Sequence, residues 1–327
     1  MVECCVYLSP LFLICIIRSA QVAWIGYPNT TGLPTIEYRI TDDIADAVDS
    51  KQGYVEELVR MPPPYAFLCY TPTLNPPEVA PTPALKNGFV TFGSFNNLAK
   101  MNDRVLSLWS QIIQRVPNSR LLMKCKPFAC ESIRQKMLAR FESFGIESKR
   151  VDLIPLLPAT TDHLKVYNMV DISVDTFPYA GTTTTCEALF MGVPVVTLKS
   201  HPPHSSHAHN VGVSLLSRIA GMKEFIADSP EQYVNIAVAF GKDVPRLAKV
   251  RAGLRSAMLA SPLCDGEGFT RALDGVYTDI WARWCRNAPA RAAARRANPA
   301  STPVGAVLPA AASQGADASA MATGPSA

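Results

Sequence analysis

Short apolar segments rich in β-branched and aromatic residues alternate with helical patterns through the middle of the chain, and this alternation constrains the fold most. A strand, a helix and a further strand in succession give a parallel sheet with helices on its faces. We expect strands at residues 22–25, 67–70, 89–95, 120–125, 151–156, 171–175 and 193–198. Residues 89–198 are therefore predicted to form a doubly wound α/β domain.

Apolar residues also recur at helical spacing, with caps and breakers at the ends of the pattern. We expect helices that include residues 105–112, 133–141, 230–240 and 269–285. Asp103 stands where the first of these helices should be capped, and Pro117 where it should end. The second helix should be capped at Glu131 or Ser132 and should end at Gly145.

The composition is that of a globular protein for most of the 327 residues, with 48% apolar and 18% charged side chains. Residues 287–327 differ, because they are mainly Ala, Pro, Ser, Gly and Arg, and we predict that they are disordered. Three arginines and one aspartate there account for two of the four net positive charges. The rest of the chain has too little charge for a broad nucleic-acid-binding face, so we expect no nucleic-acid partner.

The nine cysteines are scattered and form no C-x-x-C pair, which disfavours a disulfide framework and a thiolate zinc site. This pattern favours a reducing compartment, and we expect the cytoplasm and nucleus. Residues 1–20 form a separate segment of uncertain status. Its apolar run, residues 6–17, is shorter than the roughly 20 residues of a membrane-spanning helix. The five residues before this run include Glu3 and no Lys or Arg, which disfavours a signal peptide. We therefore expect a buried segment, or an N-terminus without its upstream partner, and no membrane.

The first of two informative turns runs from a predicted strand into a helix and contains Asn97 and Lys100. In parallel sheets, ligands bind beyond the carboxyl ends of the strands, where amide N–H groups at helix starts are available. A lysine at the start of a helix is unfavourable, because the helix dipole is positive there, unless an anion lies between the lysine and the helix. Lys100 is therefore suited to bind a phosphate. The alternative interpretation is that Lys100 is an ordinary solvated lysine on the surface.

The second turn contains Gly181 and four consecutive threonines, 182–185, followed by Glu187. Their hydroxyl and amide groups together suit a diphosphate, and Glu187 suits ribose hydroxyls. The alternative is ordinary helix capping, which one threonine would satisfy. The turn matches neither G-x-G-x-x-G nor a Walker A motif.

The histidines give a weaker signal. His163 follows a predicted strand and suits stacking on a nucleobase, with a purely structural histidine as the alternative. His201, His204, His207 and His209 lie in one segment that has prolines and no carboxylate. We interpret that segment as a flexible loop near the ligand and expect no metal site.

Several stretches resemble the Spindly and O-GlcNAc transferase proteins, which form glycosyltransferase family 41, and the pattern is closest to plant-type Spindly. They are residues 24–42, 89–102, 116–128, 148–158, 171–197 and 207–216, which include DTFPYAGTTTTCEALFMG and HAHNVGVSLL. The resemblance spans about residues 21–286 and implies the C-terminal catalytic part of a GT-B enzyme. Residues 21–88 would then be a remnant of the N-terminal lobe with a linker, and residues 89–286 a Rossmann-like lobe that binds the nucleotide sugar.

The implied activity is transfer of a sugar to Ser and Thr hydroxyls of intracellular proteins, with inversion and without a metal or other cofactor. The donor would be GDP-fucose or UDP-GlcNAc, and the Thr-rich turn and the HAHN segment favour GDP-fucose. By resemblance Lys100 contacts the donor diphosphate and acts in catalysis. The donor-binding residues would be Asn97, His163 for the base, Thr182, Thr183 and Thr184 for the phosphates, and Glu187 for the ribose.

Members of this family also carry tetratricopeptide repeats and a complete N-terminal lobe, which this sequence does not contain. The alternative interpretation is therefore a donor-lobe fragment that binds nucleotide or a partner protein without catalysis. The third and weakest interpretation is nucleic-acid binding through the Arg-rich tail.

Overall fold

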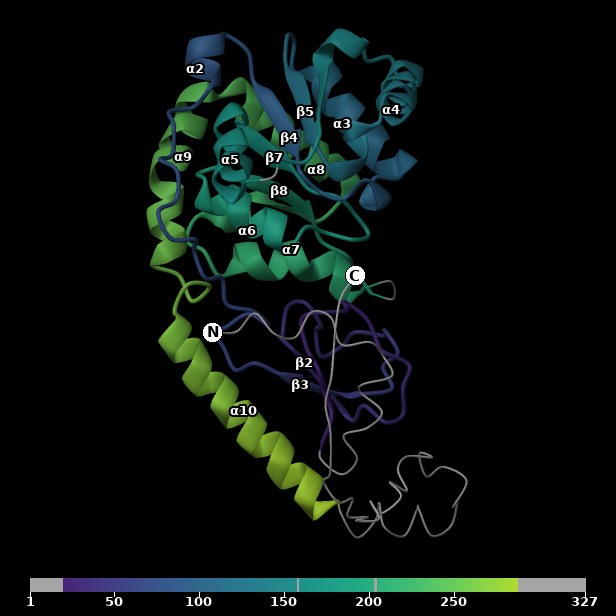
Figure 1. The fold of residues 1–327 in the computed structure, drawn as a ribbon, viewed down its shortest axis with the longest axis vertical. Helices are drawn as coiled ribbons and strands as arrows, with labels where there is room; N and C mark the ends of the chain where they lie inside the picture. Colours follow the sequence, from purple (N-terminus) through teal and green to yellow (C-terminus); the bar gives the residue numbers. More distant parts are fainter. Residues whose placement is uncertain (1–19, 158, 203–204, 288–327) are drawn as a thin grey trace, which may run out of the picture. The chain divides into compact units, whose positions relative to one another are not determined.

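The central element of the computed structural model is a six-stranded parallel sheet with the strand order β6-β5-β4-β7-β8-β9 (Figure 1). The strands are β4 (Thr91–Ser94), β5 (Arg120–Lys124), β6 (Val151–Ile154), β7 (Ile172–Val174), β8 (Val195–Leu198) and β9 (Ile226–Ala227). The order reverses between β4 and β7, which pair directly although β5 and β6 separate them in the chain. Doubly wound sheets bind ligands at this reversal, beyond the carboxyl ends of the strands.

The structure describes residues 20–157, 159–202 and 205–287. Residues 20–285 belong to one unit by their internal contacts. The apolar run at 6–17 and the tail predicted to be disordered lie outside the described residues, apart from Asn287. Within the described part of the chain, no helix is both long and apolar enough to cross a membrane.

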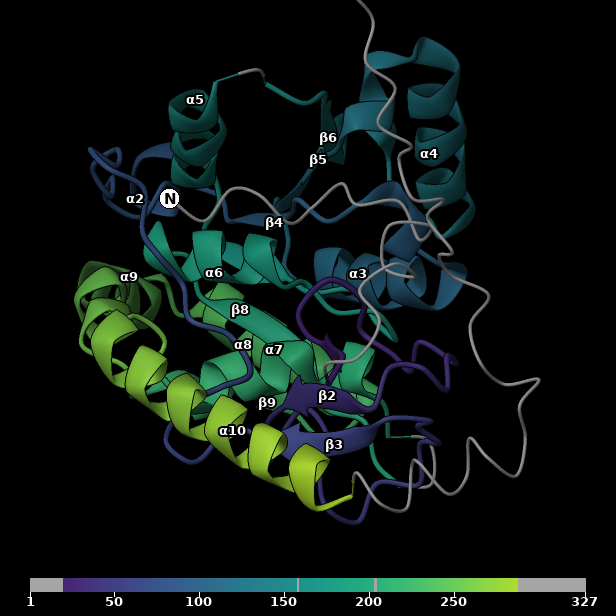
Figure 2. The same ribbon diagram turned by 60° about the horizontal axis from the view of Figure 1, so that its bottom comes forward.

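Helices cover both faces of the large sheet, as right-handed crossovers require (Figure 2). One face carries α3 (Asp103–Arg115), α4 (Glu131–Ser143) and α8 (Pro230–Lys242). The other carries α5 (Thr160–Lys165), α6 (Thr183–Phe190), α7 (His207–Ser217) and α9 (Val244–Leu259). The predicted doubly wound α/β fold is confirmed.

The predicted helix starts are close to the observed ones. Asn102, and not Asp103, caps α3, because its side chain accepts a hydrogen bond from the amide of Val105 at 3.1 Å. Cys130 precedes α4, which begins at Glu131. The apolar face of α3 lies against the sheet, and its tryptophan, Trp109, is 1% exposed.

Residues 67–70 were expected to be a strand, and this expectation is wrong. The amide of Phe67 donates to Asp42 Oδ2 at 2.8 Å, and the amide of Tyr70 donates to the carbonyl of Leu263 at 2.6 Å. Because these partners lie outside any ladder, the apolar segment is buried without joining a sheet.

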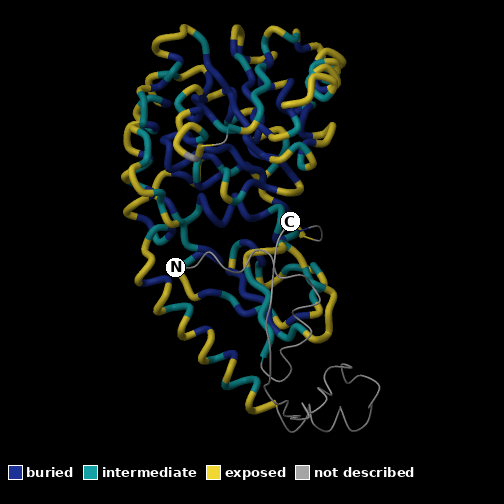
Figure 3. Tube along the Cα trace, viewed as in Figure 1, coloured by how far each residue is buried: buried dark blue, intermediate teal, exposed yellow. Residues whose placement is uncertain are grey.

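A second parallel sheet consists of β1 (Val22–Ala23), β2 (Tyr38–Thr41) and β3 (Glu57–Arg60). Only the first of these strands was expected from the sequence. The long helix α10 (Gly266–Arg286) packs on this sheet through Phe269, Val276 and Ile280. Buried positions recur along this otherwise exposed helix (Figure 3), so the sheet and α10 form a core of their own.

Candidate functional site

The two predicted turns meet where the strand order reverses. Lys100 ends a short 3-10 helix, η1 (Leu98–Lys100), which follows β4. Its Nζ donates to the carbonyl of Ala180 at 2.8 Å and lies 3.8 Å from the centroid of the Tyr179 ring. Since Ala180 directly precedes Gly181, the structure brings Lys100 to the Thr-rich turn.

Asn97, the second predicted residue of the first turn, has a local role. Its side chain accepts a hydrogen bond from the amide of Ala99 at 3.0 Å and so caps η1. Burial lowers the pKa of the Lys100 ammonium, and the nearby Asp175 carboxylate opposes that shift. No carboxylate forms an ion pair with Lys100 among the described residues, so its charge is available to an anion.

The Thr-rich turn provides the start of α6. Thr182 precedes the helix, and its side chain makes no capping hydrogen bond. The hydroxyl of Thr184 donates to Asn96 Oδ1 at 3.0 Å, which ties the start of α6 to the end of β4. Amide groups in the first turn of a helix lack intrahelical acceptors and favour a negative charge. Thr183 and Thr184 therefore stand where an anion would be bound.

Asp175 holds this turn in place, although sequence analysis gave it no role. Its Oδ1 accepts hydrogen bonds from the amides of Thr176 at 2.9 Å and Gly181 at 2.7 Å, and its Oδ2 accepts one from the Thr197 hydroxyl at 2.9 Å. Burial raises the pKa of the Asp175 carboxyl to about 6. A polar residue at the end of a buried strand, directly before the turn, is the signal that would have identified it.

Gly181 permits this close arrangement. A Cβ atom at this position would lie 2.6 Å from Thr184 Oγ1 and 2.7 Å from Thr185 Oγ1. The glycine is thus required for the approach of the loop to the first turn of α6.

Glu187 and His163 are also brought together. The Nε2 atom of His163 lies 2.8 Å from Glu187 Oε2, and the hydroxyl of Tyr167 donates to the same oxygen at 3.1 Å. Glu187 lies one helical turn after Thr183, about 6 Å along the axis of α6. We call Lys100, Thr183, Thr184, Glu187 and His163 the switch-point site.

Lys124 adds a second cation that sequence analysis missed. It is the last residue of β5, only 2% exposed, and its Nζ contacts His163 Nδ1. The ammonium also lies 5.0 Å from the centroid of the Phe95 ring. Burial lowers its pKa, while the charge of Glu187 opposes that shift. A lysine that ends a run of buried strand residues was the available signal.

Two of the other histidines, His207 and His209, lie in α7 and not in the predicted loop. His207 is not in a flexible loop: it begins α7, is buried, and its Nδ1 lies 2.7 Å from Asp46 Oδ2. That hydrogen bond and the ring of Phe67, 4.9 Å away, anchor the start of the helix. His201 is exposed, and His204 lies outside the described residues. Among the residues that are described, no cluster of three or more His, Cys, Asp and Glu side chains suits a metal ion.

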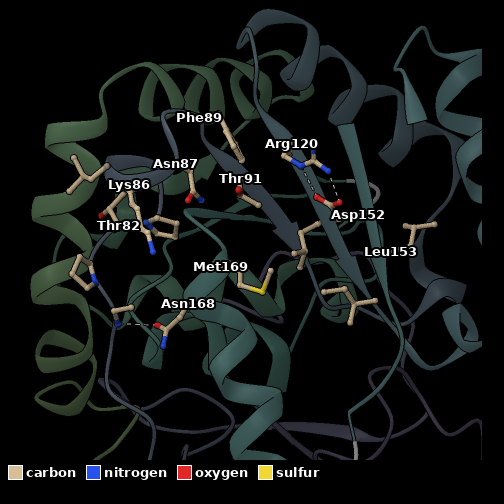
Figure 4. Close-up of a pocket in the computed structure, with 16 residues that line it drawn as sticks. Thr82, Lys86, Asn87, Phe89, Thr91, Arg120, Asp152, Leu153, Asn168 and Met169 are labelled. Atoms are coloured by element: carbon tan, nitrogen blue, oxygen red, sulfur yellow. Dashed lines mark hydrogen bonds and ion pairs between the residues drawn. The ribbon is translucent and has the colours of Figure 1, made fainter. Parts of the chain in front are cut away.

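A cavity of about 830 Å³ lies apart from the switch-point site and is lined by residues of β4, β5 and β6, among them Thr91, Arg120 and Asp152 (Figure 4). Its walls are mostly apolar, and its one arginine, Arg120, is paired with Asp152 through hydrogen bonds of 2.6 and 2.8 Å. None of the predicted site residues lines it. Its guanidinium is already neutralised and its other cation, Lys86, is exposed to solvent, so the cavity suits a nucleoside diphosphate less well than the switch-point site does.

Comparison with known proteins bears on the family of the chain. Residues 82–273 match Glycosyl transferase family 41. The protein named "Probable UDP-N-acetylglucosamine--peptide N-acetylglucosaminyltransferase SPINDLY" from Hordeum vulgare is 56% identical over 265 residues, which are 81% of this chain and 27% of that protein. The protein of the same name from Arabidopsis thaliana is 56% identical over 266 residues, 81% of this chain and 28% of that protein.

A solved structure is also similar. A mutant O-GlcNAc transferase from Thermobaculum terrenum superposes with a TM-score of 0.75 at 33% identity, over 82% of this chain and 49% of that chain. This chain spans little more than a quarter of the length of the curated relatives. The family match, the identity to SPINDLY proteins and the structural likeness together confirm the predicted family and GT-B fold class: the chain belongs to glycosyltransferase family 41.

Proposed function

We propose that this chain binds a nucleotide sugar at the switch-point site as part of a glycosyltransferase that modifies Ser and Thr hydroxyls of proteins. The observation that carries the proposal is the contact of Lys100 with Ala180, directly before the Thr-rich start of α6. A cation and a helix start converge there without a carboxylate paired to the lysine among the described residues. The names of the relatives support the same class of reaction.

The diphosphate would lie between Lys100 and the amides of Thr183 and Thr184, with Thr182 and Asn97 at its edge. Glu187 would accept hydrogen bonds from the ribose, because both of its described hydrogen bonds end on Oε2 and leave Oε1 for a ligand. The ring of His163 would pack on the base.

In the reaction, the bond between sugar C1 and the diphosphate oxygen breaks while the Ser or Thr oxygen bonds to C1 from the opposite face. The hydroxyl loses its proton to a base, and the nucleoside diphosphate leaves. Negative charge grows on the leaving group, so Lys100 and the first-turn amides stabilise the transition state more than the ground state. This cationic and amide environment supports leaving-group stabilisation by the protein, without a metal or other cofactor.

The donor proposed is GDP-fucose or UDP-GlcNAc, and the acceptors are intracellular proteins in the cytoplasm and nucleus. The second candidate function is binding of nucleotide or a partner protein without turnover. Incubation with each sugar nucleotide and a protein extract, followed by mass spectrometry of Ser and Thr residues, distinguishes the two functions.

Calorimetric titration with GDP and UDP tests the binding site. We expect at least one nucleotide to bind the wild-type chain and Lys100→Met to weaken it about ten- to a hundredfold, because a charge-assisted hydrogen bond contributes about 1.5–3 kcal/mol. Lys86→Met is the matched control, since Lys86 is an exposed lysine of α2 (Ala84–Asn87) that lines the separate cavity. Equal affinities for wild type and Lys100→Met would contradict the proposed site.

A further inference from the structure

The strand β3 forms one edge of the three-stranded sheet, because β2 is its only neighbour in the described part of the chain. The amide of Glu57 points towards β2 and donates to the carbonyl of Glu37 at 2.8 Å. Successive residues of a strand turn their N–H and C=O groups to opposite edges, so those of Leu58 and Arg60 face the open edge. None of these four backbone groups has a hydrogen-bond partner among the residues that the structure describes.

A groove runs between this edge and α10, which lies beside β3 (Figure 2). Its cavity of about 430 Å³ is lined by Leu58, Val59 and Arg60 from β3 and by residues of α10 that include Ala272 and Gly275. We call this cavity and the edge of Leu58 and Arg60 the β3–α10 groove. Because both residues with free backbone groups line the cavity, the edge is accessible to a ligand. Free strand edges of this kind bind extended peptides, which add a strand to the sheet.

Gly275 keeps the β3–α10 groove open. It is an exposed residue in the interior of α10, and a Cβ atom there would meet nothing within 4 Å. Neither a positive φ nor a close contact therefore requires glycine at this position. Glycine in the interior of a helix is destabilising relative to alanine, so the fold alone gives no reason for it. A longer side chain would take up space in the cavity that Gly275 lines.

The charges of the β3–α10 groove favour an acidic ligand. Arg60, Arg271 and Arg283 line it together with one carboxylate, Asp279. Arg283 is neutralised, because it pairs with both Asp279 and Glu57. The guanidinium of Arg60 donates to two backbone carbonyls, at 2.8 and 3.4 Å, and Arg271 has one exposed carboxylate of its own helix 3.8 Å away. A second copy of the chain would bring the same arginines against one another, so this edge disfavours self-pairing.

We propose that the β3–α10 groove binds an extended acidic segment of another protein, which adds to the edge of β3 as a further strand. The segment forms backbone hydrogen bonds with Leu58 and Arg60, and its Asp or Glu side chains lie near Arg60 and Arg271. Pro62 also lines the cavity and has no N–H group, so the ladder ends there. This inference goes beyond the nucleotide-sugar site and does not depend on it.

Fluorescence anisotropy with synthetic peptides tests strand addition on the wild-type chain, without any nucleotide. The probe is a fluorescein-labelled peptide of five Glu-Val repeats. We expect it to bind at least about tenfold more tightly than the same peptide with every backbone amide N-methylated, because the methylated peptide cannot donate to the edge. A peptide of five Lys-Val repeats should also bind at least about tenfold more weakly. Equal binding of the methylated and unmethylated peptides, or no binding by the folded chain, would overturn the proposal.

The variant Gly275→Leu places the binding in the groove. Leucine favours a helix interior over glycine, so the variant should be at least as stable as the wild type in thermal denaturation. Its side chain fills the groove, and we expect the affinity for the Glu-Val peptide to fall about tenfold. Gly253→Leu is the matched control, because Gly253 lies inside α9 and a Cβ atom there also meets nothing within 4 Å. If Gly275→Leu bound the peptide as tightly as Gly253→Leu, the groove would not be the binding site.

The variant Arg271→Glu tests the acidic preference. We expect it to bind the Glu-Val peptide about fivefold more weakly than Lys249→Glu, which makes the same change of charge at an exposed lysine of α9. Equal affinities of these two variants would show an effect of net charge alone and would overturn the assignment of an acidic partner. Sedimentation of the wild type tests the other occupant: a dimer that Gly275→Leu abolishes would assign the edge to a second copy of the chain and overturn the proposal.

Discussion

Asp175 is a buried carboxylate at the end of β7, and its ionisation links the stability of the fold to pH. Burial raises its pKa to about 6 from an ordinary value of 3.8. The folded state therefore binds this proton more tightly than the unfolded state. Between pH 3.8 and 6 the folded state holds more protons, so the contribution of Asp175 to stability falls as the pH rises through this window.

The variant Asp175→Asn tests this sign, because an amide oxygen can still accept from Thr176 and Gly181 but does not titrate. From pH 4 to pH 7, the unfolding free energy of the wild type should fall relative to the variant by about 2.4 kcal/mol, at about 1.4 kcal/mol per proton and pH unit. Urea denaturation at both pH values measures the difference. Asp274→Asn, which changes an exposed aspartate of α10, is the control. If the difference in unfolding free energy between the wild type and Asp175→Asn did not change with pH, the assignment would be contradicted.

Individual residues were predictable where their type was unusual for their place. Lys100 at a helix start and four threonines after Gly181 are conspicuous in the sequence, and the structure brings them together. Asp175 and Lys124 were missed because each looks like an ordinary residue at the end of a strand. Their importance comes from tertiary partners such as Gly181 and His163, which no local pattern reveals.

The loop before α6 depends on a close approach that only glycine permits. Gly181→Ala would place a methyl group against the hydroxyls of Thr184 and Thr185. We expect a loss of about 1–3 kcal/mol in the free energy of unfolding and about tenfold weaker nucleotide binding, because the start of α6 must shift. Thermal denaturation and calorimetry measure both effects.

Gly253→Ala is the matched control for that substitution. Gly253 lies within α9, and a Cβ atom there meets nothing within 4 Å. Alanine favours a helix interior over glycine, so this variant should be as stable as the wild type or more stable, with unchanged nucleotide affinity. If Gly181→Ala also left stability and binding unchanged, the close packing of the loop would not matter for the site.

Elements were predictable where hydrophobic periodicity was strong, as in α3 and β5. The strands β2 and β3 were missed because their sequences, YRIT and ELVR, mix charged and apolar residues without a clear period. Conversely, residues 67–70 have strand-like composition, but Asp42 and Leu263 take their amide hydrogens. The start of α7 at His207 was mistaken for a loop because its anchor, Asp46, lies 161 positions away in the sequence.

The described chain contains two hydrophobic cores. One lies around the six-stranded sheet, and the other lies between the three-stranded sheet and α10. The switch-point site is built on the first core, with Lys100 after β4 and α6 after β7. The alternation of strands and helices was sufficient to predict this first core, whereas the second depends on pairing residues 22–60 with a helix near residue 280.

A crystal structure of the chain with GDP tests the central claim most directly. We expect the diphosphate within hydrogen-bonding distance of Lys100 Nζ and the amides of Thr183 and Thr184. Glu187 should contact the ribose, and the base should lie beside His163. A nucleotide bound instead in the cavity beside Arg120 and Asp152, or with its phosphates remote from Lys100, would contradict it.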